Sequence, residues 1–411
     1  LYSPLTVAAG AEFRQETFTV VAGDADSFAI GPFADQGFSI GSNGFPGFSP
    51  DIAGDFDRRN IAAYIDLTAD LHESWTMQVA GRVESFDSFG TQGTVKASTR
   101  IGLGQLLGFD YGDTFAIRGA VGTGFRAPSA GQANISNVST VATGNVLVNR
   151  GTIPPTNPVA VRFGGQELEP ETSINITGGI VMNFSDSFSV TADYYNIQVF
   201  DRISQSRTIT LTSTEAAELE ADGIRGASDL QEFRFFTNAF DTMTQGVDVV
   251  ATTQLDFEDA GRTQLSLAYA WNQTRVGDFL DTAIDIQRIA ELEDALPNHR
   301  FVLTGTHLVG PFRFMLRGSF YDSFQNPSNA SGDLSDIDDF TYGATFLVDA
   351  EIGYSFFEDH FQVVVGAANL LNTFPDENSE GFQRALGAVY PENSPIGFNG
   401  GFYYFRLQAQ L

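Results

Sequence analysis

The sequence has no cysteine in 411 residues, which excludes a disulfide framework, a thiolate metal site and a cysteine nucleophile. It has only four histidines, and none falls in a spacing typical of a metal pair or of the base that activates a nucleophile. No glycine-rich phosphate loop follows a strand pattern and opens a helix, so nucleotide chemistry has no support. We therefore expect neither an enzyme nor a protein with a cofactor.

Basic side chains and long apolar runs are also scarce. The chain has 22 Lys and Arg against 51 Asp and Glu, a net charge of −29. Such a chain lacks the basic face that nucleic acid requires, so we expect no nucleic-acid partner. No run of eighteen apolar residues occurs, which excludes a membrane helix. The opening Leu1-Tyr2-Ser3-Pro4 has no signal-peptide features, and we interpret the chain as a mature protein or a fragment of one.

Glycine and aromatic residues are abundant instead, with 42 Gly, 38 Phe and 12 Tyr. Apolar residues recur at every second position over long stretches. Between residues 345 and 356, for example, Phe346, Val348 and Ile352 take one parity, whereas Asp349 and Glu351 take the other. A period of two predicts β-strands that have one apolar face and one wet face.

Fourteen segments show this alternation, and most of the connections between them are short and long in turn. Strands of about ten residues, with tight turns at one end and long loops at the other, are typical of a transmembrane β-barrel. The predicted strands are 3–16, 59–71, 74–86, 94–103, 113–126, 172–184, 187–199, 240–256, 263–275, 299–309, 312–322, 345–356, 360–371 and 401–411. The predicted long loops lie near 17–58, 127–171, 200–239, 276–298, 323–344 and 372–400.

The antiparallel sheet of a soluble protein also alternates in this way, and two features favour the membrane barrel over it. The polar face of the predicted strands carries charges deep within it, such as Arg118 and Arg317. The apolar face carries aromatic residues near strand ends, such as Trp75 and Tyr354. An even number of strands then places both chain ends in the periplasm and the long loops outside the cell.

The acidity of the chain is concentrated in the long loops. Taken as residues 17–57, 127–171, 200–232, 276–297, 322–342 and 372–399, these loops hold 31 acidic and 7 basic side chains. We interpret them chiefly as a solvated rim; the alternatives are that they disfavour anionic ligands at the entrance or bind divalent cations. The clustered carboxylates Asp333, Asp336, Asp338 and Asp339 are weak candidates for a cation site, because they lack the spacing of a calcium loop.

The predicted inner face of the wall has nearly balanced charges. Arg313 and Arg317 lie on the strand next to the one that carries Asp349 and Glu351, so we expect ion pairs across these two strands. A structural lattice of such pairs is favoured over a ladder that selects substrate. The residues expected to face the lumen or a plug are Arg118, Arg126, Arg313, Arg317, Asp349, Glu351 and Arg406.

One segment within the long loops, 212–223 (TSTEAAELEADG), predicts a short helix. Thr212 and Glu215 have the spacing of a capping box, and Gly223 is a residue at which a helix can end. We expect this helix to be an addition to its loop.

Five short motifs give the chain a family resemblance. They are GTGFRAPS at 122–129, LEPETS at 168–173, NAFDTMTQGVD at 238–248, GAANLLNTFPD at 366–376 and GFNGGFYYFR at 397–406. In this order and spacing, they resemble the C-terminal part of the barrel of TonB-dependent outer-membrane receptors. Two positions depart from the family pattern: Gly400-Gly401 stands where Gly-Arg is usual, and the last residue is Leu411 rather than Phe.

The resemblance implies a 22-stranded barrel that encloses an N-terminal plug, of which residues 1–411 supply the last fourteen strands. The expected partners are a plug-plus-barrel segment with a TonB box (a separate chain or a missing remainder), the inner-membrane TonB complex, outer-membrane lipids, and a small-molecule or oligosaccharide ligand. The implied function is active import, across the outer membrane of a Gram-negative bacterium, of a scarce bulky nutrient such as a siderophore complex, cobalamin or an oligosaccharide. Two alternatives stay open: a passive fourteen-stranded channel, and a surface-binding barrel without transport.

Overall fold

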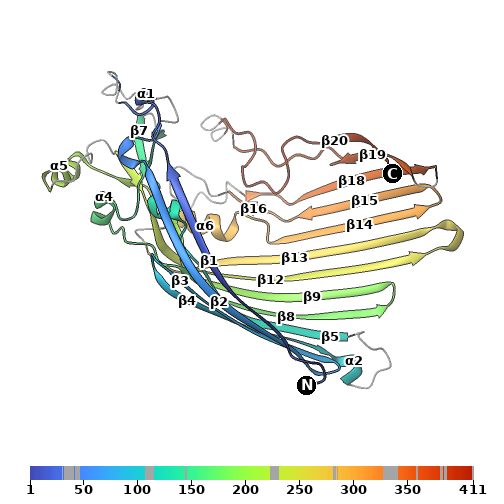
Figure 1. Cartoon of the computed structure of the whole chain (residues 1–411). Helices are drawn as coiled ribbons and strands as arrows, with labels where there is room; N and C mark the ends of the chain where they lie inside the picture. Colours follow the sequence, from blue (N-terminus) through green and yellow to red (C-terminus); the bar gives the residue numbers. More distant parts are fainter. Residues whose placement is uncertain are drawn as a thin grey trace.

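The fold is dominated by one antiparallel sheet of fourteen strands, seen in a computed structural model of the chain (Figure 1). The structure describes residues 1–29, 31, 41, 47–106, 115–143, 146–222, 231–280, 284, 286–326, 341–357, 360–379, 383 and 387–409. The strands of the main sheet, in spatial order, are β1 (Thr6–Val20), β2 (Gly54–His72), β3 (Trp75–Phe86), β4 (Gly90–Gly102), β5 (Phe115–Arg126), β8 (Glu171–Ser185), β9 (Phe188–Gln205), β12 (Phe236–Asp256), β13 (Arg262–Phe279), β14 (His299–Val309), β15 (Phe312–Tyr321), β18 (Thr345–Phe356), β19 (Phe361–Ala368) and β20 (Phe402–Ala409).

All fourteen predicted strands are confirmed, in a simple meander in which each pairs with the next. The sheet is strongly curved, with most of its tight turns at one end and most of its long connections at the other (Figure 1). We call these the short-turn end and the long-loop end. Two connections depart from this rule: the tight turn 87–89 between β3 and β4 lies at the long-loop end, and the connection 103–114 between β4 and β5 lies at the short-turn end. β1 begins and β20 ends at the short-turn end.

The two faces of the sheet differ as the alternation predicts. The strand register places apolar residues opposite apolar residues and polar residues opposite polar residues: Trp75 lies opposite Ile101, and Thr76 opposite Arg100. Large apolar side chains such as Val79 and Val95 are exposed on one face, the apolar face, although they are hydrophobic. A row of exposed hydrophobic residues along a whole sheet marks a surface that contacts lipid rather than water.

Aromatic rings border the apolar face at both ends. On β15, the ring centroid of Phe312 at the short-turn end lies 5.0 Å from that of Tyr354. At the other end, the ring centroid of Phe320 lies 6.1 Å from that of Phe301. These two phenylalanines are eight positions apart, which is about 26 Å along a strand at roughly 3.3 Å per residue. A strand tilted by about 40° spans about 20 Å of bilayer over this length, close to the apolar band of about 25 Å between aromatic girdles.

The strands in the middle of the sheet extend beyond that band at the long-loop end. β12 has 21 residues, whereas β19 and β20 have eight each. Where β9, β12 and β13 rise above the last aromatic residues, the apolar face turns polar, with Asn196, Gln245 and Gln273 in register. The longest strands are therefore β12 with 21 residues, β2 with 19, and β9 and β13 with 18 each, and the shortest are β19 and β20.

Two long connections fold together into a small subdomain at the long-loop end. Strands β6 (Asn137–Thr143), β7 (Val146–Thr152), β10 (Ile209–Thr210) and β11 (Glu232–Arg234) form a second sheet, which packs with helices α4 (Pro158–Arg162) and α5 (Ser213–Ala221). Its core is built of Ile153, Val159, Ala160, Leu211, Ala216, Leu219, Phe233 and Phe235. The predicted helix is confirmed as α5, with its capping box present, and it is part of this core rather than a mere addition to its loop.

Helix α6 (Ile286–Asp294) packs against the upper part of β13. Its Glu293 accepts a hydrogen bond from the backbone N–H of Val276 at 2.7 Å, and Val276 lies in register with Thr242 on the polar face. The remaining elements are α1 (Ala25–Phe28), η2 (Pro50–Ile52), α2 (Leu103–Leu106), α3 (Ala130–Asn134), η5 (Glu258–Ala260) and the β16–β17 pair (Phe324–Gln325 and Thr341–Tyr342). In the described part of the chain, none of the helices has the length and apolarity needed to cross a membrane.

Candidate functional site on the polar face

Glu351 is the centre of the ion-pair lattice near the end of the sheet. Arg313 donates to its carboxylate at 2.6 Å from β15, and Arg406 approaches at 3.7 Å from β20. The hydroxyl of Tyr404 also donates to it. Only 11% of the Glu351 side chain is exposed, so one carboxylate fastens three strands together.

Arg317 and Asp349 form the second expected pair, at 3.8 Å across β15 and β18. Asp349 also accepts the backbone N–H of Asn369 at 2.8 Å, and Arg317 donates to Thr304 at 3.3 Å. These groups therefore have partners within the wall, as a structural lattice requires. The predicted pairing of Arg313 and Arg317 with Glu351 and Asp349 is confirmed.

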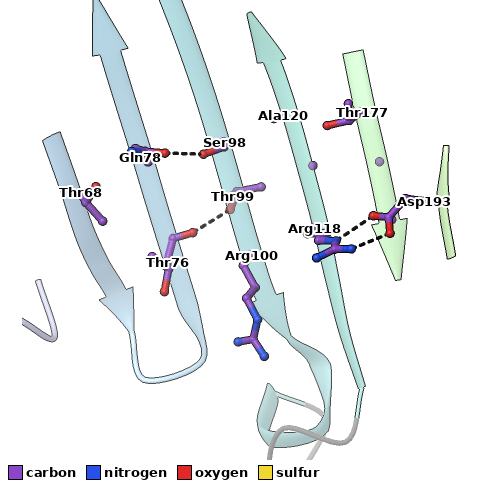
Figure 2. Close-up of a pocket in the computed structure, with 13 residues that line it drawn as sticks. Thr68, Thr76, Gln78, Ser98, Thr99, Arg100, Arg118, Ala120, Thr177 and Asp193 are labelled. Carbon is purple, nitrogen blue, oxygen red and sulfur yellow. Dashed lines mark hydrogen bonds and ion pairs between the residues drawn. The ribbon is translucent and has the colours of Figure 1, made fainter. Parts of the chain in front are cut away.

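A hollow of about 370 Å³ lies on the polar face of β2, β3, β4, β5, β8 and β9, toward the short-turn end (Figure 2). Hydroxyl and amide side chains line much of it, and Gln78 accepts a hydrogen bond from Ser98 at 3.1 Å. At one side, Arg118 makes a bidentate pair with Asp193 at 2.8 and 2.5 Å. Figure 2 shows Arg100 pointing toward the short-turn end, away from that pair.

Glycines allow long side chains to cross one strand and reach the next. Asp193 on β9 reaches Arg118 on β5 by passing over Gly179 of β8, where a Cβ atom would overlap the Asp193 carboxylate. Tyr404 lies in the same way over Gly366 on its path to Glu351. Part of the abundance of glycine in the sequence therefore has a structural use: it lets polar side chains bridge strands that are not neighbours.

Arg126, on the polar face at the end of β5, belongs to a clamp at the long-loop end. It pairs with both oxygens of Glu171, at 2.7 and 2.5 Å, and Glu171 also accepts the backbone N–H of Ile203 at 2.7 Å. Asn238 completes the clamp by donating to the carbonyl groups of Glu169 and Asp201, at 2.9 and 2.8 Å. Three of the sequence motifs, GTGFRAPS, LEPETS and NAFD, therefore meet at one structural joint.

The motif before the last long loop is also structural. Asn369 and Asn372 both adopt positive φ, of 52° and 54°, a conformation that asparagine tolerates better than most residues. The side chain of Asn369 makes two hydrogen bonds with the backbone of Thr373, and that of Asn372 accepts the N–H of Gly401 at 2.9 Å. Asp376 accepts the N–H of Gly343 at 2.7 Å, which ties this loop to the preceding one.

Metal binding finds no support in the described residues, which contain no group of three or more His, Asp or Glu side chains placed to hold an ion. The weak candidates Asp333, Asp336, Asp338 and Asp339 lie outside the described residues. The histidines are dispersed. His299 and His307 lie at opposite ends of β14, where their rings are hydrogen-bonded to Tyr269 and Thr263 respectively. His72 and His360 lie beside short turns.

A meander with one apolar face suited to lipid, one ion-paired polar face and most of its long connections at one end is the wall of an outer-membrane β-barrel. The profile described as TonB dependent receptor-like, beta-barrel matches residues 4–370. The chain belongs to this family of outer-membrane transporter barrels.

Solved receptors share the fold at low sequence identity. A point mutant of the ferric enterobactin receptor PfeA of Pseudomonas aeruginosa aligns with a TM-score of 0.63 and 12% identity, over 98% of this chain and 51% of the receptor. The siderophore receptor PirA of Acinetobacter baumannii gives 0.61 and 16%, over 99% and 52%. The outer-membrane transporter YddB of Escherichia coli gives 0.57 and 9%, over 86% and 45%. The chain thus spans about half the length of these receptors, and no curated protein matches it significantly.

Proposed function

We propose that this chain is the C-terminal wall of a TonB-dependent receptor that imports a scarce, bulky nutrient across the outer membrane, in the manner expected of siderophore, cobalamin or oligosaccharide uptake. The observation that carries the proposal is the family match over residues 4–370, together with a fourteen-stranded sheet whose apolar face is exposed. Long loops on the cell exterior would receive the ligand, and the short turns and chain ends would face the periplasm.

A second segment is needed to complete this barrel. Among the described strands, β1 pairs only with β2 and β20 only with β19, and the two edges lie well apart (Figure 1). An open sheet edge in lipid leaves backbone N–H and C=O groups unpaired, at a cost of several kcal/mol for each group. We infer that a segment similar in length to the other half of the solved receptors supplies further strands and the plug, and that this segment engages the TonB complex.

The polar face is proposed as the surface that holds the plug. Most of its arginines are already paired with carboxylates within the wall, so the plug would meet a largely neutral lattice rather than a set of open charges. That arrangement suits a plug that must be held firmly at rest and moved when force is applied. The residues assigned to this surface are Arg118, Arg126, Arg313, Arg317, Asp349, Glu351 and Arg406.

Energy-dependent uptake tests the proposal. Cells that produce the complete receptor are given a panel of radio-iron siderophore complexes, labelled cobalamin and labelled oligosaccharides, with and without a functional TonB complex. We expect uptake of at least one ligand that stops when TonB is removed or the proton gradient is collapsed, while surface binding remains. A receptor lacking the gene segment for this chain is the control.

The two alternatives give different results. A passive channel would pass ligand and ions without TonB and would show steady conductance in planar bilayers. A surface-binding barrel would bind without any uptake. Either outcome, in cells where another TonB-dependent receptor takes up its own ligand normally, would refute the proposed function.

A further inference from the structure

A second hollow on the polar face differs from the first in having almost no charge. It has a volume of about 690 Å³ and lies at the short-turn end of β8, β9, β12, β13 and β14. Among the described residues that line it, Asp186 in the turn between β8 and β9 is the only charged one. A face that is ion-paired elsewhere therefore has a neutral stretch, in a chain of net charge −29.

The strand register gathers hydroxyl and amide side chains into two adjoining rows on this stretch. Each residue of a row lies opposite the next one on the neighbouring strand. The first row is Asn183, Ser189, Thr252, Ser266 and Thr304, and the second, nearer to the short turns, is Gln254, Gln264 and Thr306. We call these residues the neutral belt. Their strands lie side by side in the middle of the sheet (Figure 1).

The neutral stretch is also long in the direction of the strands. On β12, Asp248 and Asp256 are the charges that bound it on the polar face, and the three positions of that face between them are uncharged. These aspartates are eight positions apart, about 26 Å along a strand. Asp256 lies at the rim, where it pairs with Arg262 at 3.6 Å. The belt therefore leads from the middle of the wall to its short-turn rim without a fixed charge.

The polar face is charged on both sides of the belt. On one side, Arg100, Arg118 and Asp193 line the first hollow. On the other side, Arg317 pairs with Asp349 across β15 and β18. Hydrogen bonds to ionised groups are stronger than those between neutral groups, so a plug would be held more firmly beside the belt than on it.

The hydrogen bonds within the belt are neutral and exchangeable. The hydroxyls of Ser189 and Thr252 bond to each other at 2.8 Å, and Gln264 donates to Gln254 at 3.5 Å. Hydroxyl and amide groups both donate and accept, so they can pair with water or with any polar group of a passing molecule. Passage requires binding that is favourable enough for entry and weak enough for release. Neutral groups in rows meet this requirement, whereas a fixed charge would retain a molecule of opposite charge.

We propose that the neutral belt is the side of the wall along which a hydrophilic ligand leaves the barrel, between the wall and the plug. The inference rests on the proposed uptake function and gives it a route. The ligand moves past β8, β9, β12, β13 and β14 by exchanging hydrogen bonds with the hydroxyl and amide groups. The plug keeps its contacts with the charged strands on both sides, so it does not have to leave the barrel.

Reversible narrowing of the belt tests this route, because the chain has no cysteine of its own. Cells with the complete receptor carrying Gln264→Cys or Ser266→Cys are treated, during energised uptake, with a bulky neutral methanethiosulfonate, which attaches its group through a disulfide. The probes are radio-iron enterobactin, a neutral radio-iron trihydroxamate and labelled cobalamin. For each probe that the untreated receptor imports, the initial rate should fall about tenfold, which corresponds to an added barrier of about 1.4 kcal/mol. Surface binding should be unchanged, and a reductant that removes the group should restore the rate.

Gln362→Cys is the matched control. Gln362 is a glutamine of the polar face near the short turns, and it donates to Ser355 at 3.5 Å, just as Gln264 donates to Gln254. The bulky group at Gln362 should leave uptake unchanged, because β19 lies outside the belt. Methyl methanethiosulfonate, which adds only a thiomethyl group, should leave most of the rate of the belt variants. Mass spectrometry measures the modified fraction of each variant.

The outcomes separate the route from the proposed function. Slow uptake confined to the belt variants that carry the bulky group, with surface binding retained, supports the route. Belt cysteines that stay unmodified during uptake, modified belt variants that import at the normal rate, or an equal block at Gln362→Cys each overturn it, while the transporter stands. If the untreated receptor imports no probe under TonB control, the proposed function fails and the route fails with it.

Discussion

At the scale of single residues, the polar face depends on glycines as crossing points. Two side chains, Asp193 and Tyr404, reach partners two strands away because the strand between them carries Gly179 or Gly366. A methyl group at either position would occupy space that the crossing side chain fills. The glycines therefore set which charges can meet, and the lattice of ion pairs depends on positions that carry no charge.

The substitution Gly179→Ala tests this role. Its Cβ would overlap the Asp193 carboxylate, so the side chain must move and the bidentate pair with Arg118 is lost. Because Arg118 is 48% exposed, we expect a loss of only about 1 kcal/mol in the free energy of unfolding. Urea unfolding of the receptor in detergent or lipid measures the change.

Gly178→Ala is the matched control, since its Cβ meets no atom within 4 Å. Adding Arg118→Gln should remove most of the difference between the two glycine variants, because the pair is then already absent. Equal stability of Gly178→Ala and Gly179→Ala would show that the crossing contributes nothing to the wall.

At the scale of elements, local signals are readable in the sequence and tertiary ones are not. Helix α5 could be predicted because its capping box, Thr212 with Glu215, is a contact three residues apart. Helix α6 and strands β6, β7, β10 and β11 were missed. β11 pairs with β7 in parallel across a long stretch of chain, and α6 depends on contacts with β13, so neither leaves a clear periodic pattern.

The cap of α5 gives a prediction for this element. Thr212 accepts the backbone N–H of Glu215 at 3.3 Å, and the Glu215 carboxylate accepts both the hydroxyl and the backbone N–H of Thr212, at 2.6 and 2.8 Å. Thr212→Ala removes two of these three bonds and should destabilise the helix by about 1 kcal/mol. Faster hydrogen exchange over Ser213–Ala221, with unchanged exchange in the barrel strands, is the expected result.

The same cap should depend on pH. The hydroxyl of Thr212, and after it the backbone N–H, hold the pKa of Glu215 below its ordinary value. A lowered carboxyl pKa means that the stabilisation is complete above the ordinary glutamate pKa and is lost as pH falls through the folded value. Protection of α5 should therefore fall in acid for the wild type and for Glu218→Gln, but not for Glu215→Gln. If Glu215→Gln responds to acid just as the wild type does, this carboxylate is not the titrating group.

At the scale of the whole molecule, the sequence was informative about the wall and its ion pairs and uninformative about the cavity at the long-loop end. The alternation of residues such as Phe346, Asp349 and Glu351 predicts strands, because every second side chain meets the same environment. The cavity at the long-loop end that Arg207, Arg234 and Arg288 line could not be predicted, because these residues lie on segments far apart in the chain that only the fold brings together. The net charge of the long loops could not predict this cavity either, because it is a sum over residues that do not lie on a common surface.

The distance between the two sheet edges tests whether β1 pairs directly with β20. Because this chain has no cysteine, spin labels can be attached at Ala9→Cys on β1 and Leu407→Cys on β20, both on the apolar face of the sheet. If eight further strands lie between these edges in a tilted 22-stranded barrel, the labels should be roughly 40 Å apart, from a strand spacing of about 4.8 Å. A fourteen-stranded barrel closed by direct pairing of β1 with β20 would bring the labels to within roughly 20 Å, since adjacent strands are only about 4.8 Å apart. The pair Ala9→Cys and Ile65→Cys, directly opposite on β1 and β2, gives the short-distance control. Double electron–electron resonance measures these distances on the complete receptor in lipid. A short distance would mean that this chain closes on itself, as a passive channel would. A long distance would mean that it forms one side of a larger barrel that has room for a plug.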